Sequence, residues 1–188
     1  MSPTRSTLLT LLLGLCSACV PTLYPLYQPA DLVYEPGIAG KWKGEDEPGD
    51  DYWSFTGQAR DDLVLTVYED GEQSHFNARV LVLDGIKFLD LEPFPLEDSG
   101  SEFYRGHFVP THTFYRLGVE RDRLILSGLD LNWLEEALRK REVEIDFHQI
   151  NKNLLLITSP TEALQRMALK AVDSGGFSDE AVLIRNGE

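Results

Sequence analysis

The side chains that could carry acid–base or metal chemistry are four histidines, which are scattered along the chain. His107 and His112 flank Pro110, His75 begins an expected strand, and His148 lies on the polar side of another. Two or three of them could converge with a carboxylate on a zinc ion, but no helical His-Glu-x-x-His or zinc-finger spacing is present. Histidines bonded to backbone at strand ends are the favoured interpretation. The sequence therefore predicts neither a metal site nor a cofactor.

Acidic side chains gather around Pro48 and Gly49, where Glu45, Asp46, Glu47, Asp50 and Asp51 occur together. Carboxylates at this density can bind calcium, yet the alternating ligands and the terminal bidentate glutamate of a dedicated calcium loop are missing. We interpret the cluster as a solvated hairpin tip, which also discourages edge-to-edge association of strands.

Motifs for nucleophilic catalysis do not occur, because the sequence holds neither Gly-x-Ser-x-Gly nor Ser-x-x-Lys. Asp90 is the carboxylate that stands out, since leucines flank it on both sides. Strand alternation gives Asp90 the parity of Phe88, towards the interior, and a salt bridge to Arg79 or Arg116 is the expected use. A glycosidase-like pair of carboxylates stays open as an alternative, because 31 acidic residues offer many pairs. We expect no catalytic residue and no enzyme.

Residues 92–110 form a connection that is long for a compact domain, and such connections are often functional. The segment carries four aromatic residues and two potential cations. We expect it to lie as a lid over an open barrel end, with Phe103, Tyr104 and Arg105 nearest a bound ligand. An equally weighted alternative is a surface loop packed by its own aromatics.

The two cysteines lie at the end of an apolar N-terminal segment. Arg5 precedes an apolar run over residues 8–15, which is far shorter than the ~20 residues that span a bilayer. Small residues then precede Cys19, and this pattern resembles the lipobox of bacterial lipoproteins. The resemblance implies a signal peptide over residues 1–18, a diacylglyceryl thioether on Cys19 and an acylated amino group. Cleavage before Cys16 is disfavoured because it would place the bulky Leu15 beside the cut; an ordinary secretory signal peptide with an unmodified cysteine is the alternative.

Such a lipid determines the expected subcellular location of the protein. Several acyl chains, at ~0.8 kcal/mol per buried CH₂, make attachment to a membrane effectively permanent. Val20 is not the aspartate that usually marks retention in the inner membrane, so the outer membrane, facing the periplasm, is favoured for a Gram-negative source. With both cysteines used in processing, the mature chain cannot form an internal disulfide or a cysteine nucleophile.

The charge balance excludes one class of partner. Without Arg5, 16 basic residues stand against 31 acidic ones. A field of this sign repels nucleic-acid phosphate, and no basic stripe offsets it, so nucleic-acid binding is disfavoured and we expect no nucleic-acid partner. The same charge repels anionic headgroups and keeps the protein soluble in a crowded envelope.

The mature chain has the length of one well-buried domain. Residues 19–37 contain four prolines interleaved with leucine and tyrosine, so they predict a tether that packs on the body. Residues 38–188 predict a single domain of short strands and tight turns. The expected strands cover residues 40–43, 52–56, 63–69, 75–83, 86–91, 111–120, 124–129, 143–147, 154–158 and 181–185. Asp70-Gly71 and Asp84-Gly85 are typical of two-residue hairpin turns.

Two helices interrupt this pattern. The first is expected over residues 133–141 with Asn132 as its N-cap. The second is expected over residues 161–173, with Ser159 as its cap and Pro160 at the first helical position. A mainly β, α+β fold follows, in which an antiparallel up-and-down meander closes into a β-barrel and the second helix lies near the C-terminus. Closure would bury the apolar sheet face and remove the exposed edges.

Gly40-Lys41-Trp42 resembles the Gly-x-Trp signature of the lipocalins and other calycins. That resemblance implies that Trp42 plugs one end of the barrel, and that a helix and a short extra strand follow the last main strand. Their second pattern, a Thr-Asp-Tyr type of turn, has no match in this sequence.

The mature chain also resembles a group of bacterial envelope lipoproteins without an assigned activity. The matching features are Tyr24-Pro25-Leu26-Tyr27, the Gly-x-Trp strand, Phe88-Leu89-Asp90-Leu91, His112-Thr113-Phe114 and Asp130-x-x-Trp133-Leu134. This resemblance implies the location in the cell envelope and the fold, and it implies no mechanism.

Together these features predict a membrane-anchored envelope lipoprotein that acts as a non-enzymatic binding or interaction module. Its expected partners are the membrane, through the lipid on Cys19, and an apolar ligand or another envelope protein. The alternative is a carrier of a small apolar ligand in the barrel cavity, and an envelope hydrolase is the third possibility. A packed interior would favour the interaction module, whereas a cavity of ~300 Å³ or more would favour the carrier.

Overall fold

The computed structural model describes residues 20–45, 50–95, 101–151 and 154–186, and describes only the backbone of Tyr104 and Asp179. The expected signal peptide, Cys19, and Asp46 and Glu47 of the acidic cluster lie outside the described residues.

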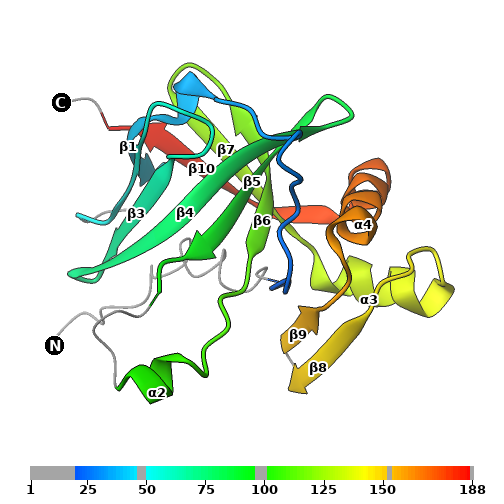
Figure 1. The fold of residues 1–188 in the computed structure, drawn as a ribbon. Helices are drawn as coiled ribbons and strands as arrows, with labels where there is room; N and C mark the ends of the chain where they lie inside the picture. Colours follow the sequence, from blue (N-terminus) through cyan, green and yellow to red (C-terminus); the bar gives the residue numbers. More distant parts are fainter. Residues whose placement is uncertain (1–19, 46–49, 96–100, 152–153, 187–188) are drawn as a thin grey trace, which may run out of the picture.

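Eight antiparallel strands close into a barrel (Figure 1). They are β1 (Gly40–Gly44), β2 (Tyr52–Thr56), β3 (Val64–Glu69), β4 (Glu72–Leu83), β5 (Ile86–Pro93), β6 (Thr113–Val119), β7 (Arg123–Leu129) and β10 (Phe177–Arg185). The first seven follow one another as a meander, and β10 closes the sheet by pairing with both β7 and β1. The predicted mainly β fold, with a meander that closes into a barrel and a second helix near the C-terminus, is confirmed.

The hairpin turns form where the sequence predicts them. Asp70 and Gly71 connect β3 to β4 with φ of 52° and 84°, and Asp84 and Gly85 connect β4 to β5 with φ of 48° and 80°. Positive φ at both central residues matches the right-handed twist of the flanking strands, and Asp-Gly tolerates it well. These local turns set the register of β3, β4 and β5, and β5 carries Asp90 of the site described below.

Two apolar clusters lie on opposite faces of the barrel wall. The interior cluster contains large side chains such as Trp42, Trp53, Phe55 and Tyr115, together with leucines from most strands. The outer cluster lies between the wall and the elements that cover it, and it includes Phe88 and Phe114 from the wall. Strand alternation therefore places odd and even residues of β5 in two different cores.

The connection from β7 to β10 builds the cover. It consists of α3 (Leu131–Lys140), a separate hairpin of β8 (Phe147–Asn151) and β9 (Leu154–Ile157), and α4 (Thr161–Asp173). Helix α4 lies on the outside of the wall, where Leu164, Met167 and Ala168 enter the outer cluster. The expected strand over residues 143–147 is wrong by several positions: the chain turns after α3, since Arg141 is left-handed with φ of 59°, and the strand begins only at Phe147.

The caps of both helices differ from the expected ones. Asp130, rather than Asn132, caps α3, because its carboxylate accepts hydrogen bonds from the backbone N–H groups of Asn132 and Trp133. Pro160 is the N-cap of α4 and makes no side-chain cap bond. Ser159 is unavailable as a cap because its hydroxyl accepts from the backbone N–H of Asp146 at 2.6 Å.

Strand β10 departs from the arrangement that the calycin resemblance implies. The strand after α4 is an integral wall strand of nine residues that pairs on both sides, and it is not a short extra strand. The helices and the β8–β9 hairpin are thus an insertion before the last barrel strand.

The segment before β1, residues 20–39, runs along the outer wall; we name it the strap. Figure 1 shows it passing from the end of the barrel that carries the β8–β9 hairpin to the end near the C-terminus. Leu32 forms a bridge to Leu81 of β4, and the strap ends in the short helix η1 (Pro36–Ile38) before β1 begins. The strap therefore joins the two ends of the barrel on the side where α4 lies.

Candidate functional site

The start of the strap lies between two elements that are far apart in the sequence. Thr22 forms an antiparallel bridge to His112, with hydrogen bonds of 2.8 Å in both directions. It also bridges Ile157 of β9, where Leu23 N–H donates to the Ile157 carbonyl and Ile157 N–H donates to that of Pro21. Residues 21–23 are thus a connecting strand between the base of the long loop and the β8–β9 hairpin.

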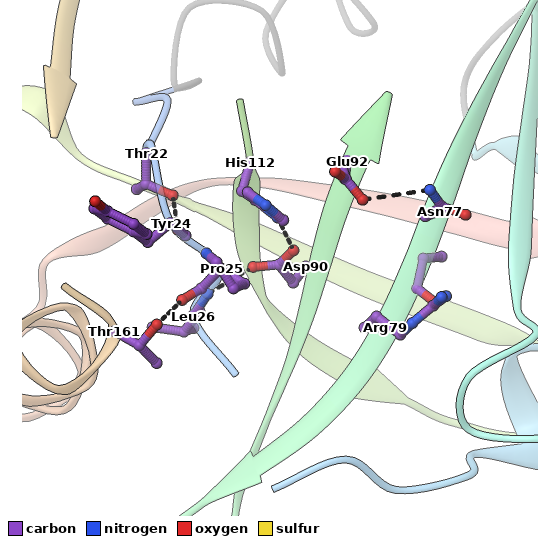
Figure 2. A network of polar contacts seen from close by, with 11 residues as sticks. Thr22, Tyr24, Pro25, Leu26, Asn77, Arg79, Asp90, Glu92, His112 and Thr161 are labelled. Atoms are coloured by element: carbon purple, nitrogen blue, oxygen red, sulfur yellow. Dashed lines mark hydrogen bonds and ion pairs between the residues drawn. The ribbon is translucent and has the colours of Figure 1, made fainter. Parts of the chain in front are cut away.

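Below this point the strap crosses a buried carboxylate, shown in Figure 2. Asp90 is 1 % exposed, and its Oδ2 accepts a hydrogen bond from the backbone N–H of Leu26 at 2.8 Å. Its Oδ1 lies 2.7 Å from Nδ1 of His112, which is 7 % exposed. We name Leu26, Asp90, His112 and the residues that hold the strap beside them, Thr22 and Thr161, the clamp.

Helix α4 completes the clamp from the other side of the strap. The hydroxyl of Thr161, in the first turn, donates to the Pro25 carbonyl at 2.8 Å. One turn later the Gln165 amide donates to the Leu26 carbonyl at 2.9 Å and to the Asp31 carboxylate at 2.7 Å. Because a buried backbone group without a partner is costly, these bonds are what allow a proline-containing segment to lie against an apolar wall.

The expected environment of Asp90 is wrong in two respects. Asp90 shares the face of Phe88, as alternation predicts, but Phe88 belongs to the outer cluster, so this face points away from the barrel interior. The partner of Asp90 is His112, not Arg79 or Arg116. Arg79 lies opposite Asp90 on β4 but donates to the carbonyls of Leu63 and Ala78.

The pKa of His112 is raised above its ordinary value. Burial by itself lowers this pKa, because it disfavours the imidazolium, but the hydrogen bond and the negative charge of Asp90 outweigh burial, and Glu92 adds to them. Burial also raises the pKa of the nearby Tyr27 hydroxyl, and the charge of Asp90 raises it further. The fold therefore favours the protonated form of His112 beside the Asp90 carboxylate under the strap.

The carboxylate of the clamp is fully used by the fold. Both carboxylate oxygens of Asp90 accept bonds from groups that belong to the fold. The Thr22 hydroxyl on the strap donates to the Tyr24 carbonyl at 2.7 Å, so it is not paired with the imidazole as a nucleophile would be.

The residue expected as the barrel plug, Trp42, is fully buried in the interior cluster. Its indole N–H donates to the Ile38 carbonyl at 2.8 Å, and the Arg185 guanidinium lies 4.2 Å from its ring centroid. Arg185 in turn donates to the carbonyls of Gly37 and Ala39. Gly40 has φ of +128°, and a Cβ there would lie 2.6 Å from the Arg185 guanidinium, so a glycine is required before this tryptophan.

The long loop exposes Phe94, Phe103 and Phe108 to solvent. It contains the short helix α2 (Glu102–Arg105), which projects from the barrel in Figure 1. Phe103 is 80 % exposed, and its ring contacts the imidazole of His107 at 4.6 Å between centroids. Arg105 is half-buried. Whether these residues act on a ligand stays a prediction.

The other candidates do not assemble into a site. His75 bonds to the Thr66 hydroxyl, His107 to the Phe103 carbonyl, and His148 lies on the exposed strand β8. Over the part of the chain that the structure describes, no group of three or more His, Cys, Asp and Glu side chains is arranged to hold a metal ion. Glu45 forms an exposed ion pair with Arg123.

A cleft of about 250 Å³ lies on the outside of the barrel, between α4 and the turn that follows α3. Val143, Ala163 and Met167 give it an apolar floor, and Glu142, Glu144, Arg166 and Lys170 give it a rim of both signs. It is distinct from the barrel interior and from the clamp.

Sequence reasoning missed the clamp as a unit, although it noted Asp90 and the His112 motif. The available signal was a carboxylate between leucines together with a histidine one strand away, both in a chain whose N-terminal segment is too apolar for a free linker. None of the helices in the described ranges is long and apolar enough to cross a membrane. Comparison of the chain with protein-family models, with curated proteins and with solved structures gives no match.

Proposed function

We propose that the protein is a bacterial envelope lipoprotein, cleaved before Cys19 and anchored through a lipid on that residue, whose barrel serves as a non-enzymatic interaction module. The outer membrane, facing the periplasm, is the proposed location. One observation carries the proposal: Val20, directly after Cys19, is 7 % exposed and belongs to the outer cluster. A chain that begins at Cys19 would therefore place the lipid directly against the folded body.

The clamp supports this role because it fixes the point of attachment. Thr22, three residues after Cys19, bonds to two separate elements, and Leu26 is fully buried over Asp90. A lipid on a flexible linker would leave the orientation of the barrel free, whereas a lipid on this strap would restrict it.

A fractionation experiment tests the anchoring. Cys19→Ser should release the protein from membranes or block its processing, whereas Cys16→Ser should leave both unchanged and serves as the matched control. Loss of anchoring in Cys16→Ser and not in Cys19→Ser would move the lipid to the other cysteine. Retention of both variants on membranes would contradict the lipoprotein proposal.

The filled interior supports an interaction module over a carrier. Large side chains from most strands meet inside the barrel, and Trp42, Phe55, Leu65 and Leu89 are buried there with exposures of at most 1 %. Native mass spectrometry of the protein extracted from its own envelope tests this choice directly. A co-purifying protein supports the interaction module, and a retained small apolar molecule contradicts it.

The carrier remains the second candidate because of one side chain. Trp53 is 7 % exposed in the interior cluster, and among the described residues its indole N–H is a buried donor without a hydrogen-bond partner. Such a donor could bond to a polar group of a ligand. If it does, Trp53→Phe should weaken the uptake of a fluorescent fatty acid, and wild-type protein that takes up none would exclude the carrier.

A further inference from the structure

Exposed apolar side chains gather at one end of the barrel. Among the described residues, ten large hydrophobic side chains are exposed. Eight of them lie at the start of the strap, on the 94–112 connection or on the β8–β9 hairpin; the other two are Tyr34 and Ile184. Val109 is 67 % exposed and Ile150 is 50 % exposed, comparable to Phe103 in the same region. Helix α2 of the long connection and the β8–β9 hairpin both project from the barrel on the side where the described chain begins (Figure 1).

Thr22 shows that these elements adjoin the anchor. It bridges His112, where the long loop returns to the barrel, and Ile157, at the base of the hairpin. The connections from β5 to β6 and from β7 to β10 leave the same end of an antiparallel meander, so both projections also lie at one end by topology. Cys19 is three residues before Thr22, so a lipid there would emerge between the two projections.

The segments next to the anchor contain few acidic residues. The three longest runs without Asp or Glu in the chain after residue 18 are residues 19–30, 103–119 and 147–161. At the average frequency of 31 in 188 residues, about seven acidic residues would be expected in these runs together. The bridges at Thr22 bring the three runs into contact, so the part of this end around the anchor is poor in carboxylates. Acidic side chains border it, since Glu102 precedes Phe103 and the β3–β4 turn with Glu69, Asp70 and Glu72 leaves the same end of the meander.

From the position of these side chains, we infer that this end of the barrel lies on the lipid bilayer around the anchor, with Phe103 and Ile150 at the tips of two projections that enter the headgroup region. This inference rests on the proposed lipidation of Cys19. Aromatic and aliphatic side chains are favoured at that depth, and the scarcity of carboxylates next to the anchor lowers repulsion by anionic headgroups there. Exposed apolar groups in such number otherwise mark a contact surface.

Single cysteines provide the test, because the only cysteines of the chain are Cys16, which is removed with the signal peptide, and Cys19, whose thiol is consumed by the lipid. Phe103→Cys and Ile150→Cys are each labelled with an environment-sensitive fluorophore, and the lipidated proteins are reconstituted into phosphatidylcholine vesicles that contain nitroxide lipids. Tyr34→Cys is the control, since Tyr34 is 44 % exposed, close to the 50 % of Ile150, but lies on the strap near η1, at the other end of the barrel.

The expected result is a blue shift and quenching by the lipid nitroxides at positions 103 and 150, with no change at position 34. Equal quenching at all three positions would overturn the inference, because the barrel would then have no preferred face. Labels at 103 and 150 that stay in water while the protein floats with the vesicles would overturn it and leave the anchoring intact. Protection seen only in native envelopes would overturn it in favour of a protein partner, and failure of the wild type to float would instead refute the anchoring.

Discussion

The two ends of the barrel use aromatic side chains in opposite ways. At the end that carries η1 and Arg185, Trp42 is fully buried, its N–H is bonded to Ile38, and a guanidinium covers its ring. At the end where the strap begins, Phe103 is 80 % exposed and contacts His107. We refer to these as the Trp42 end and the anchor end.

The two ends differ in how much their aromatic side chains contribute to the stability of the fold. The Trp42 indole N–H and the Arg185 guanidinium beside it both have hydrogen-bond partners, so the stability of the barrel accounts for the burial of Trp42. The exposed side chains of the anchor end contribute little to folding, because they remove little apolar surface from water. Folding stability therefore does not account for these side chains, whereas the proposed contact with a membrane would.

The largest expected effect is at the Trp42 end. Trp42→Ala should lower the free energy of unfolding by about 3–5 kcal/mol, the usual range for truncation of a buried aromatic side chain. Phe103→Ala makes a similar truncation at the anchor end and should change it by less than about 0.5 kcal/mol. Chemical denaturation of both variants measures the contrast, and equal losses would remove the distinction between the two ends.

The clamp should show an intermediate effect. Asp90→Asn keeps an acceptor for the Leu26 N–H but removes the charge that pairs with His112, and a loss of about 1–3 kcal/mol is expected for a bond to a buried charged group. Glu72→Gln, at the exposed start of β4 and away from the clamp, is the control and should be nearly neutral. Hydrogen exchange at the Leu26 amide should accelerate in Asp90→Asn; an unchanged rate would mean that the clamp does not hold the strap.

A smaller effect should appear with pH. Because the pKa of His112 is raised in the folded protein, the protonated form favours the folded state. The stability that His112 contributes should be complete below its unfolded pKa of about 6.5 and should be lost as the pH rises through the higher folded value. Unfolding of wild type and His112→Gln across this range measures it, and a difference that grows with rising pH would contradict the assignment.

The smallest effect on stability is expected from the two projecting tips taken together. Phe103→Ser combined with Ile150→Ser should leave the free energy of unfolding within about 0.5 kcal/mol of wild type, because both side chains are exposed. A marked loss of stability would show that the tips pack within the protein, and the membrane would no longer be needed to explain them.

The parts of the fold that could be predicted from the sequence are those set by local chemistry. The Asp-Gly turns and the limits of α4 depend on neighbouring residues only, and they occur where expected. The placement of the β8–β9 hairpin outside the barrel depends on the strap and α4, which cover the wall there. No local pattern contains that information.

Asp90 shows why the candidate site could not be read in full. Alternation groups Asp90 with Phe88, but Phe88 and Leu89 are both fully buried, one in each core. When a strand is covered on both faces, the hydrophobic pattern no longer indicates which face points inward. The contact with Leu26, 64 positions away, depends on the whole topology.

The intact mass of the protein extracted from bacterial membranes tests the central claim most directly. The account predicts a chain that begins at Cys19, that is heavier than its amino acids by the mass of the acyl groups, and that has no free thiol. A chain of unmodified mass, or one whose Cys19 reacts with an alkylating reagent, would contradict it.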